Sequence, residues 1–568
     1  MPESPSTSAT TLRVALVASP LGGPPSQVHP IGAMTVASYL QTQLGDQVEA
    51  TVLNFGSTPA SRARSKACLT ELAPAVVGFP IYSSHVHEVI EWARELRRLL
   101  PDAVFVAGGP HVTLSWPGFV RRWGSVFDFA VCGDGETPML AIVRSALSGD
   151  YSTARDCPGV GWLDGEQARV NPSAAPLPVH DWTDPFRCEV LSDGQPLVFT
   201  DRRDGRLRRA VALVSSRSCP QKCSFCAIIA MPGSWRAAPT STLVDWLAGE
   251  HRRTPFEHVY FMDANFFVSA DRVRELIAAL SARLPDVTWS TSSTVGFLLA
   301  MSEDLPWLVS HGLRAIEMGI ESGSPEQLRF LNKRVSIERN RQAVELVQRN
   351  RLELGLDYIM FYPDQTVAQL KENLSFLREA RLLDEEYFDH YTNALELYPG
   401  TPLRSEFERR AGAPFDPDEL PDPDGLFADP QVRRVYRAFI HGFVPDHLPA
   451  IKSRINELRR FAADAAAEPA ARQLARLQIF LLRHVPYKVL WRLCEDETAT
   501  SAEQVLPWLA DRSFEADSVL ALAEPALQVA EPSSPVAEPS PLVAEPSLVA
   551  EPSPVAEPSP VAEPEPVG

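Results

Sequence analysis

Two stretches of the chain alternate short apolar segments with segments of helix length, and this alternation limits the fold more than any other feature. In the first stretch, 12–150, the expected strands are LRVALVA, EATVLNF, AVVGFPIY, AVFVAGG and FDFAVCG. Helices are expected over 31–44 and 86–100. Strands this apolar, separated by helices, are typical of parallel sheets covered on both faces. The pattern predicts a doubly wound, Rossmann-like α/β domain.

The second stretch, 208–405, repeats the alternation. Its first expected strand, 212–216, is followed by EHVYFMD, VTWSTSS, LRAIEMGIESG, LDYIMFYP and NALELYP. The helices between them are expected over 240–253, 270–284, 302–310, 337–351 and 367–382. Six strand–helix units are too few for a closed eight-stranded barrel. An open, partial (β/α)6 barrel is therefore expected.

Three cysteines, Cys219, Cys223 and Cys226, lie within eight residues just after the first strand of this second stretch. Three thiolates on one short loop can hold an iron–sulfur cube at three corners and leave one iron open to a ligand. The alternative is a zinc site with a distant fourth ligand. The nearest histidines after the motif, His251 and His258, lie far along the chain.

The spacing CxxxCxxC, with Phe225 before the last cysteine, resembles the signature of the radical S-adenosylmethionine (SAM) superfamily. The resemblance implies that the three cysteines bind a 4Fe–4S cluster whose open iron chelates SAM. The segments MGIESGS and YPGTPL resemble parts of the family that contact SAM, whereas FYPDQT departs from the usual glycine-rich turn. Implied SAM contacts are Phe225, Glu321, Ser322, Gly323, Gly400 and Thr401, and the implied catalytic residue is Asp263.

These residues also have plainer interpretations. Asp263 and Glu321 can be helix caps or solvated strand ends. Gly400 and Thr401 can simply form a turn, and Phe225 can be a core residue.

The order of elements before the barrel resembles the cobalamin-binding domain of one class of radical SAM enzymes. HPIGAMTVASYL resembles its first helix, and AGGPHVT and CGDGE resemble its later loops. Implied cobalamin contacts are Ser83, Gly108, Gly109, Gly133, Gly135 and Glu136. Other cobalamin proteins carry Asp-x-His-x-x-Gly, but here Gln27 replaces the Asp before His29. Without a carboxylate to orient its ring, His29 is expected to be a loop residue rather than a cobalt ligand.

The remaining segments carry no recognised motif. Residues 1–11 are expected to be disordered, 151–207 to connect the two domains, and 406–515 to form a helical cap that could close the open barrel. Residues 516–568 repeat VAEPSP-like units without Lys or Arg. They should form an extended acidic tail, which serves solubility or tethers partner enzymes.

Composition and charge argue against several classes of function and location. A net charge of −19 argues against a nucleic-acid partner. The chain shows no membrane-spanning run and no signal peptide, so a cytoplasmic location is expected. The other cysteines are scattered and predict neither disulfides nor a second cluster.

Together these features predict a cobalamin-dependent radical SAM enzyme with an external, flavodoxin- or ferredoxin-like electron donor. The resemblance favours a C-methyltransferase that acts on a natural-product or peptide precursor through methylcobalamin. A cyclase or oxidoreductase without methyl transfer is the alternative, and a non-catalytic cobalamin- or metal-binding regulator is a third possibility. A methylthiotransferase is disfavoured because its additional ligand cysteines and basic RNA-binding module are missing.

Overall fold

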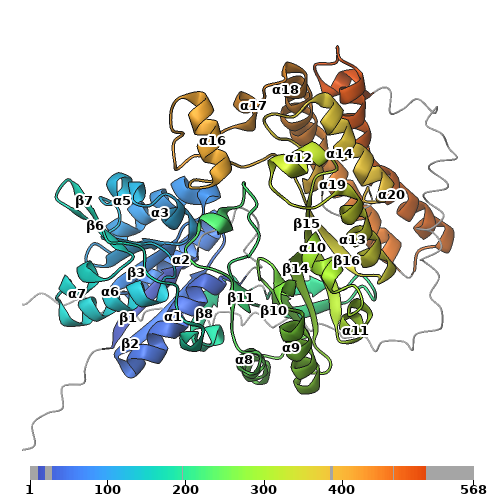
Figure 1. Cartoon of the computed structure of the whole chain (residues 1–568). Coiled ribbons are helices and arrows are strands. Elements are labelled where there is room, and N and C mark those ends of the chain that lie inside the picture. Colours follow the sequence, from blue (N-terminus) through green and yellow to red (C-terminus); the bar gives the residue numbers. More distant parts are fainter. Residues whose placement is uncertain (1–10, 19–28, 195, 384–387, 465, 507–568) are drawn as a thin grey trace, which may run out of the picture. The chain divides into compact units, whose positions relative to one another are not determined.

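The first domain is built on a twisted sheet with the strand order β7-β6-β5-β4-β3-β1-β2-β8 (Figure 1). The structure, a computed structural model, describes residues 11–18, 29–194, 196–383, 388–464 and 466–506. The parallel centre of the sheet consists of β1 (Leu12–Val17), β2 (Val48–Asn54), β3 (Val76–Pro80), β4 (Val104–Gly108) and β5 (Phe129–Val131). This confirms the expected doubly wound sheet.

Helices cover both faces of this sheet because successive side chains of each strand point to opposite sides. Val14 and Leu16 belong to the apolar cluster that includes the helices α1 and α6, whereas Ala15 and Val17 pack with α2, α3 and α5. The helices of this domain are α1 (Ile31–Leu44), α2 (Pro59–Leu72), α3 (Val86–Leu99), α4 (Pro110–Leu114), α5 (Gly118–Trp123), α6 (Glu136–Ser148) and α7 (Ser152–Asp156).

The expected connector is more regular than its sequence suggests. Within 151–207, the hairpin of β6 (Val160–Asp164) and β7 (Gln167–Val170) adds antiparallel strands to one edge of the first sheet. On the other edge, β8 (Glu189–Ser192) pairs with β2. A third strand, β9 (Val198–Thr200), pairs with the barrel strand β10. These strands are short and half-exposed, so they lack the apolar runs that reveal buried strands.

The second domain is a curled, open sheet with the order β16-β15-β14-β13-β10-β9. Its parallel strands are β10 (Leu207–Leu213), β13 (His258–Phe261), β14 (Thr288–Thr294), β15 (Leu313–Glu321) and β16 (Glu353–Tyr358). The helices around it are α8 (Thr240–Arg253), α9 (Ala270–Arg283), α10 (Val295–Ala300), α11 (Leu305–Ser310), α12 (Pro325–Phe330), α13 (Ile337–Arg349) and α14 (Val367–Glu379).

The sixth expected barrel strand is reduced to a single parallel bridge between Phe361 and Ala394. The amides of Met360 and Phe361 both donate to the carbonyl of Asn393, which interrupts the regular ladder. Pro363 and Pro399 contribute no amide donors to extend it. The described segment after Asn393 therefore forms no strand pairing beyond this bridge.

The C-terminal part is helical, as expected. Its helices are α15 (Asp389–Thr392), α16 (Pro402–Ala411), α17 (Pro423–Leu426), α18 (Pro430–Tyr436), α19 (Val444–Ala463) and α20 (Pro469–Glu495). The α19–α20 pair packs through α20 against α14 on the outside of the barrel. The described part of the chain contains no helix long and apolar enough to cross a bilayer. The predicted tail and residues 1–10 lie outside the described residues.

A glycine in the turn after β15 tests how tightly the barrel is packed. A Cβ added to Gly323 would lie 2.3 Å from Cβ of Phe376 and 2.8 Å from the carbonyl oxygen of Glu372, both on α14. The variant Gly323→Ala should lower the free energy of unfolding by about 1–3 kcal/mol because α14 must move outward. Thermal and urea unfolding measure the effect.

Gly296→Ala in α10 is the matched control, because an added Cβ meets nothing within 4 Å there. This change should leave stability unchanged or raise it by about 0.4–1 kcal/mol. Equal stability of the two variants would contradict the tight packing of Gly323.

Candidate active site

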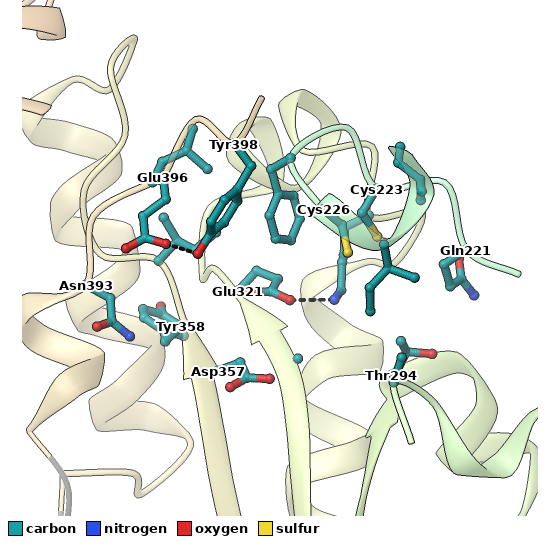
Figure 2. Close-up of a pocket in the computed structure, with 18 of the residues that line it drawn as sticks. Gln221, Cys223, Cys226, Thr294, Glu321, Asp357, Tyr358, Asn393, Glu396 and Tyr398 are labelled. Atoms are coloured by element: carbon teal, nitrogen blue, oxygen red, sulfur yellow. Dashed lines mark hydrogen bonds and ion pairs between the residues drawn. The ribbon is translucent and has the colours of Figure 1, made fainter. Parts of the chain in front are cut away.

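The three cysteines lie on a loop closed at its neck by a short hairpin. Beyond β10, Ser216–Arg217 (β11) pairs antiparallel with Arg236–Ala237 (β12), and the cysteines lie in the loop between these strands. Cys219, Cys223 and Cys226 all line a cavity of about 680 Å³ at the carboxyl end of the barrel (Figure 2). The cysteine loop thus leaves the strand end at which α/β barrels position reactive groups.

The cavity wall combines this loop, the ends of the barrel strands and the segment 392–398. Besides the cysteines, it contains Gln221, Phe225, Ile228, Ile229, Ala264, Ser292, Ser293, Thr294, Gly319, Glu321, Lys333, Asp357, Tyr358, Ile359, Thr392, Asn393, Ala394, Leu395, Glu396, Tyr398, Leu420, Pro421 and Pro423. Figure 2 shows Glu321 below Cys223 and Cys226, with Glu396 and Tyr398 on the other side of the view. Tyr398 donates its hydroxyl to Glu396.

A second loop supports the cysteine loop from below. Ser224 donates its amide to the carbonyl of Leu331 and its hydroxyl to that of Phe330, each at 3.0 Å. Asn332 donates its side-chain amide to the carbonyl of Lys222 at 2.6 Å. The same supporting loop carries Lys333 into the cavity wall. The cysteines and this lysine are therefore positioned together.

Lys333 and Glu321 form a buried ion pair at 2.6 Å. Glu321 has a left-handed backbone at φ 62°, and a Cβ on Gly319 would lie only 2.6 Å from each charged group. Burial by itself lowers the pKa of the Lys333 ammonium, but the charge and hydrogen bond of Glu321, together with the nearby Cys223 and Asp357, raise it overall. The ammonium has three donors, so it can bind a further anionic group in the cavity.

The three thiols suit an iron–sulfur cube. Burial raises the pKa of Cys223 to about 11 and also raises that of Cys226. A metal centre deprotonates the thiols that bind it, so these thiols become thiolates when the cluster binds. Among the described residues, no group of three His, Cys, Asp or Glu side chains is placed to hold a single metal ion. A cube needs no such convergence, because each of its three cysteines binds a different iron.

The residues predicted for SAM fall into two groups. Phe225 and Glu321 line the cavity, whereas Ser322, Gly323, Gly400 and Thr401 lie behind its wall. Ser322 donates to Gln327 at 2.8 Å, and the amide of Gly323 donates to Asn373. Thr401 caps α16 by accepting from the amide of Arg404.

Asp263 also lies outside the cavity wall. Its carboxylate accepts from the amide and hydroxyl of Ser215, each at 2.6 Å, and from the hydroxyl of Ser216 at 2.5 Å. Burial raises the pKa of Asp263 in spite of these hydrogen bonds. Asp263 therefore fastens the end of β10, from which the cysteine loop departs.

Sequence reasoning missed several residues of the wall, notably Lys333, Asp357, Asn393, Glu396 and Tyr398. Residues 392–396 line the wall without a break, so no alternation along this segment marked them in the sequence. Lys333 gave no such signal, because it follows α12 in a loop. Asp357 is exposed to the cavity, and its partial desolvation there, followed by the charges of Glu317 and Glu321, raises its pKa to about 7.

A second cavity, of about 300 Å³, lies at the carboxyl edge of the first sheet. It opens where the strand order reverses between β3 and β1, the place where open α/β sheets bind ligands. Five of the six predicted cobalamin residues line it: Gly108, Gly109, Gly133, Gly135 and Glu136. Tyr82 and Gly78 also line it, although the sequence did not single them out. Ser83 lies outside this wall and hydrogen-bonds to His111 Nδ1 at 3.0 Å.

The shape of this second cavity depends on backbone that bears no side chain. Gly109 has φ 94°, and an added Cβ would lie 2.8 Å from the amide nitrogen of Ile81. A slot bordered by bare backbone and apolar side chains, with the charges of Asp134, Glu136 and Arg217 in its wall, fits part of a large cofactor. The residues present therefore fit cobalamin.

Four charged side chains connect this cavity to the cysteine loop. Arg217 pairs with Glu136 at 2.5 Å and with Asp134 at 3.3 Å, and Arg236 pairs with Asp134 at 2.5 Å. Arg217 also stacks on Trp182, 4.6 Å from its ring centroid, and lines the second cavity. Arg217 and Arg236 are direct partners in the β11–β12 hairpin. The neck of the cysteine loop is therefore bound to the predicted cobalamin loop.

His29 lies away from the second cavity. Its Nδ1 accepts from the amide of Ala212 in β10 at 3.3 Å. Burial first, and then the charge of Arg209, lower the pKa of His29 to about 4, so the ring is neutral. This hydrogen bond lies beyond the residues of β10 that pair with the edge strand β9.

Removal of the Asp357 carboxyl should change how stability depends on pH. Its pKa is raised from 3.8 to about 7, so the folded state holds a proton that the unfolded state has released between these values. The contribution of this proton to the free energy of unfolding is complete below about pH 4 and is lost as the pH rises through 7. Melting temperatures should show wild type losing stability relative to Asp357→Asn from pH 5 to 8.

Asp271→Asn, at an exposed carboxylate on α9, is the control and should follow wild type at every pH. If the difference in melting temperature between wild type and Asp357→Asn stays constant between pH 5 and 8, the raised pKa of Asp357 is contradicted.

Comparison with known proteins matches both domains. Residues 21–143 match the family model for a B12 binding domain, and residues 213–377 match that of the radical SAM superfamily. The chain is 23% identical to an uncharacterized methyltransferase of Pyrococcus horikoshii, over 64% of this chain and 76% of the relative. It is 24% identical to the anaerobic magnesium-protoporphyrin IX monomethyl ester cyclase of Rubrivivax gelatinosus, over 61% of each.

A solved structure has the same fold. The cobalamin-dependent SAM radical enzyme OxsB, with aqua-cobalamin bound, superposes with a TM-score of 0.63 at 17% identity, over 92% of this chain and 80% of that one. With both domain matches, the cofactors follow: a 4Fe–4S cluster, SAM and cobalamin. The chain therefore belongs to the cobalamin-dependent radical SAM enzymes.

Proposed function

We propose that this enzyme is a C-methyltransferase that acts on a natural-product or peptide precursor. The observation that carries the proposal is that one loop serves both cavities. Seven residues of the loop 219–229 line the larger cavity, while Arg217 and Met231, just outside this range, line the smaller one. Two cofactors bound on either side of one short loop lie close enough to act on the same substrate.

Each residue has a defined part in this proposal. Cys219, Cys223 and Cys226 hold the cluster, and Glu321 keeps Lys333 oriented beside it. The Lys333 ammonium is suited to bind the carboxylate of SAM. When bound, the cluster would supply the electron that cleaves SAM, and cobalamin would carry the methyl group. Asp263 acts by positioning, because its hydrogen bonds to Ser215 and Ser216 fasten the root of the cysteine loop.

The substrate would occupy the part of the cavity facing segment 392–398. Asn393, Glu396 and Tyr398 supply polar groups there, and Ile359 and Leu395 supply apolar surface. Such a mixed wall suits a polar organic molecule or a short peptide. The electron for the cluster would come from an external flavodoxin- or ferredoxin-like donor.

A second candidate function, cyclisation or another oxidation without methyl transfer, is supported by the similarity to the Rubrivivax cyclase. It uses the same cavities and cofactors. The two functions differ in whether the methyl group of SAM reaches the product.

Isotope labelling separates them. Anaerobically reconstituted enzyme should transfer an intact CD3 group from labelled SAM to the substrate, which mass spectrometry of the product detects. Cleavage of SAM accompanied by a cyclised or oxidised product without the label would refute methyl transfer and favour the second function.

Replacing one cysteine should separate the two cofactors. Cys226→Ala should abolish the visible and electron paramagnetic resonance signals of the cluster and eliminate SAM cleavage, because the cube loses one of three protein ligands. Corrinoid absorption should remain, since Cys226 does not line the smaller cavity.

Cys68→Ala, at a half-buried cysteine on α2, is the matched control and should retain both signals. A variant at Cys226 with an unchanged cluster spectrum would overturn the ligand assignment.

A further inference from the structure

A buried carboxylate after the barrel contacts the first domain. Asp418 lies between α16 and α17 and is 4% exposed. Its Oδ1 accepts from Nε2 of His111 at 2.9 Å and from Nη2 of Arg122 at 2.8 Å, and its Oδ2 accepts from Nε of Arg122 at 2.5 Å and Nε1 of Trp123 at 2.9 Å. These hydrogen bonds engage both oxygens of the carboxylate with donors from α4 and α5.

The segment that carries Asp418 is also tied to the barrel side. We call residues 412–423 the strap. Arg404 of α16, itself buried, donates to the carbonyl of Asp416 at 2.6 Å, to that of Glu419 at 3.1 Å and to that of Leu397 at 2.9 Å. The strap is therefore fastened on one side by Arg404 and on the other by Asp418.

The strap forms part of the larger cavity. Leu420, Pro421 and Pro423, shortly after Asp418, line it. A shift of Asp418 would move this wall, because only one residue separates it from Leu420. The anchoring of Asp418 thus bears on the shape of the proposed substrate site.

His111, which bonds to Asp418, also connects to the loops that line the smaller cavity. His111 follows the Gly108–Gly109 turn, and its Nδ1 bonds to the hydroxyl of Ser83, which follows Tyr82. Gly108, Gly109 and Tyr82 all line the smaller cavity. One continuous path therefore runs from the cobalamin-binding loops through His111 and Asp418 to the wall of the larger cavity.

We propose that Asp418 is a positioning residue that couples the two cavities. Cobalamin fixes the loops after β3 and β4, these loops hold His111 and Arg122 in place, and Asp418 then fixes the strap as a wall of the substrate site. The inference rests on the proposed function only in assigning the larger cavity to the substrate. By linkage, a substrate that packs against the strap tightens cobalamin binding by the same factor.

Asp418→Asn breaks this path with almost no change in volume. Every group that faces the carboxylate is a hydrogen-bond donor, so the amide NH2 of asparagine would meet another donor and the charge that pairs with Arg122 would be lost. Glu419→Gln, at the adjacent exposed carboxylate, is the matched control. Arg122→Gln disturbs the same path from the other side.

Hydrogen exchange in peptides covering 412–423 tests the coupling in the full-length protein, with and without hydroxocobalamin and in the absence of SAM. In wild type and Glu419→Gln, hydroxocobalamin should slow exchange of the strap about fivefold or more. In Asp418→Asn and Arg122→Gln, the strap should exchange rapidly in both states, although corrinoid absorption shows that hydroxocobalamin is bound. The Arg122 variant keeps the test valid if Asp418→Asn fails to fold.

The proposal would be overturned if hydroxocobalamin left the hydrogen-exchange rate of the strap unchanged in wild type. It would also be overturned if hydroxocobalamin slowed this exchange equally in wild type and Asp418→Asn. These outcomes are distinct from failure of the proposed function. Labelled methyl transfer with an unresponsive strap would refute the coupling alone, whereas a responsive strap without methyl transfer would refute the methyltransferase alone.

Discussion

The contact between Arg217 and Glu136 is the interaction on which the relation between the two cofactor sites depends. The pair measures 2.5 Å and joins the neck of the cysteine loop to the first residue of α6. Asp134 and Trp182 enclose the same guanidinium. Removing one partner of such a buried pair typically costs about 3–5 kcal/mol, because the other charge stays buried. The separation of the two cavities is therefore set by a contact that is costly to break.

Buried charged side chains also hold the loops around the larger cavity. Loops at the carboxyl ends of parallel strands have few ladder hydrogen bonds, so buried side chains must hold them. Asp263 fastens the end of β10, the pair of Lys333 and Glu321 fixes the wall below the cysteines, and Asp418 fastens the strap. These charged groups are buried with partners, as desolvation demands. A rigid cavity suits an enzyme that must keep a reactive radical from water and from the wrong bond.

Much of the fold was predictable because its signals are local. The helices at Ile31–Leu44 and Thr240–Arg253 match the predicted ranges, since apolar periodicity and turn residues define them within a few positions. The prediction of a sixth barrel strand was wrong because a segment becomes a strand only if a neighbour offers regularly spaced hydrogen bonds. The two amides that donate to the carbonyl of Asn393 interrupt that spacing. The packing of α20 against α14 was not predictable, because amphipathic periodicity shows that a helix buries one face but not which surface that face covers.

Residue type and spacing alone were enough to predict the two α/β domains, the cysteine loop at a strand end and the glycine turns of the smaller cavity. Each of these follows from residue type and spacing over short distances. Only the tertiary structure decided that Lys333 and Asp357 enter the cavity, that Asp263 supports the loop from behind and that Asp418 meets His111. Asp418 and His111 are 307 residues apart in the chain. No local pattern encodes such a pairing, because the free energy that selects it comes from packing both domains together.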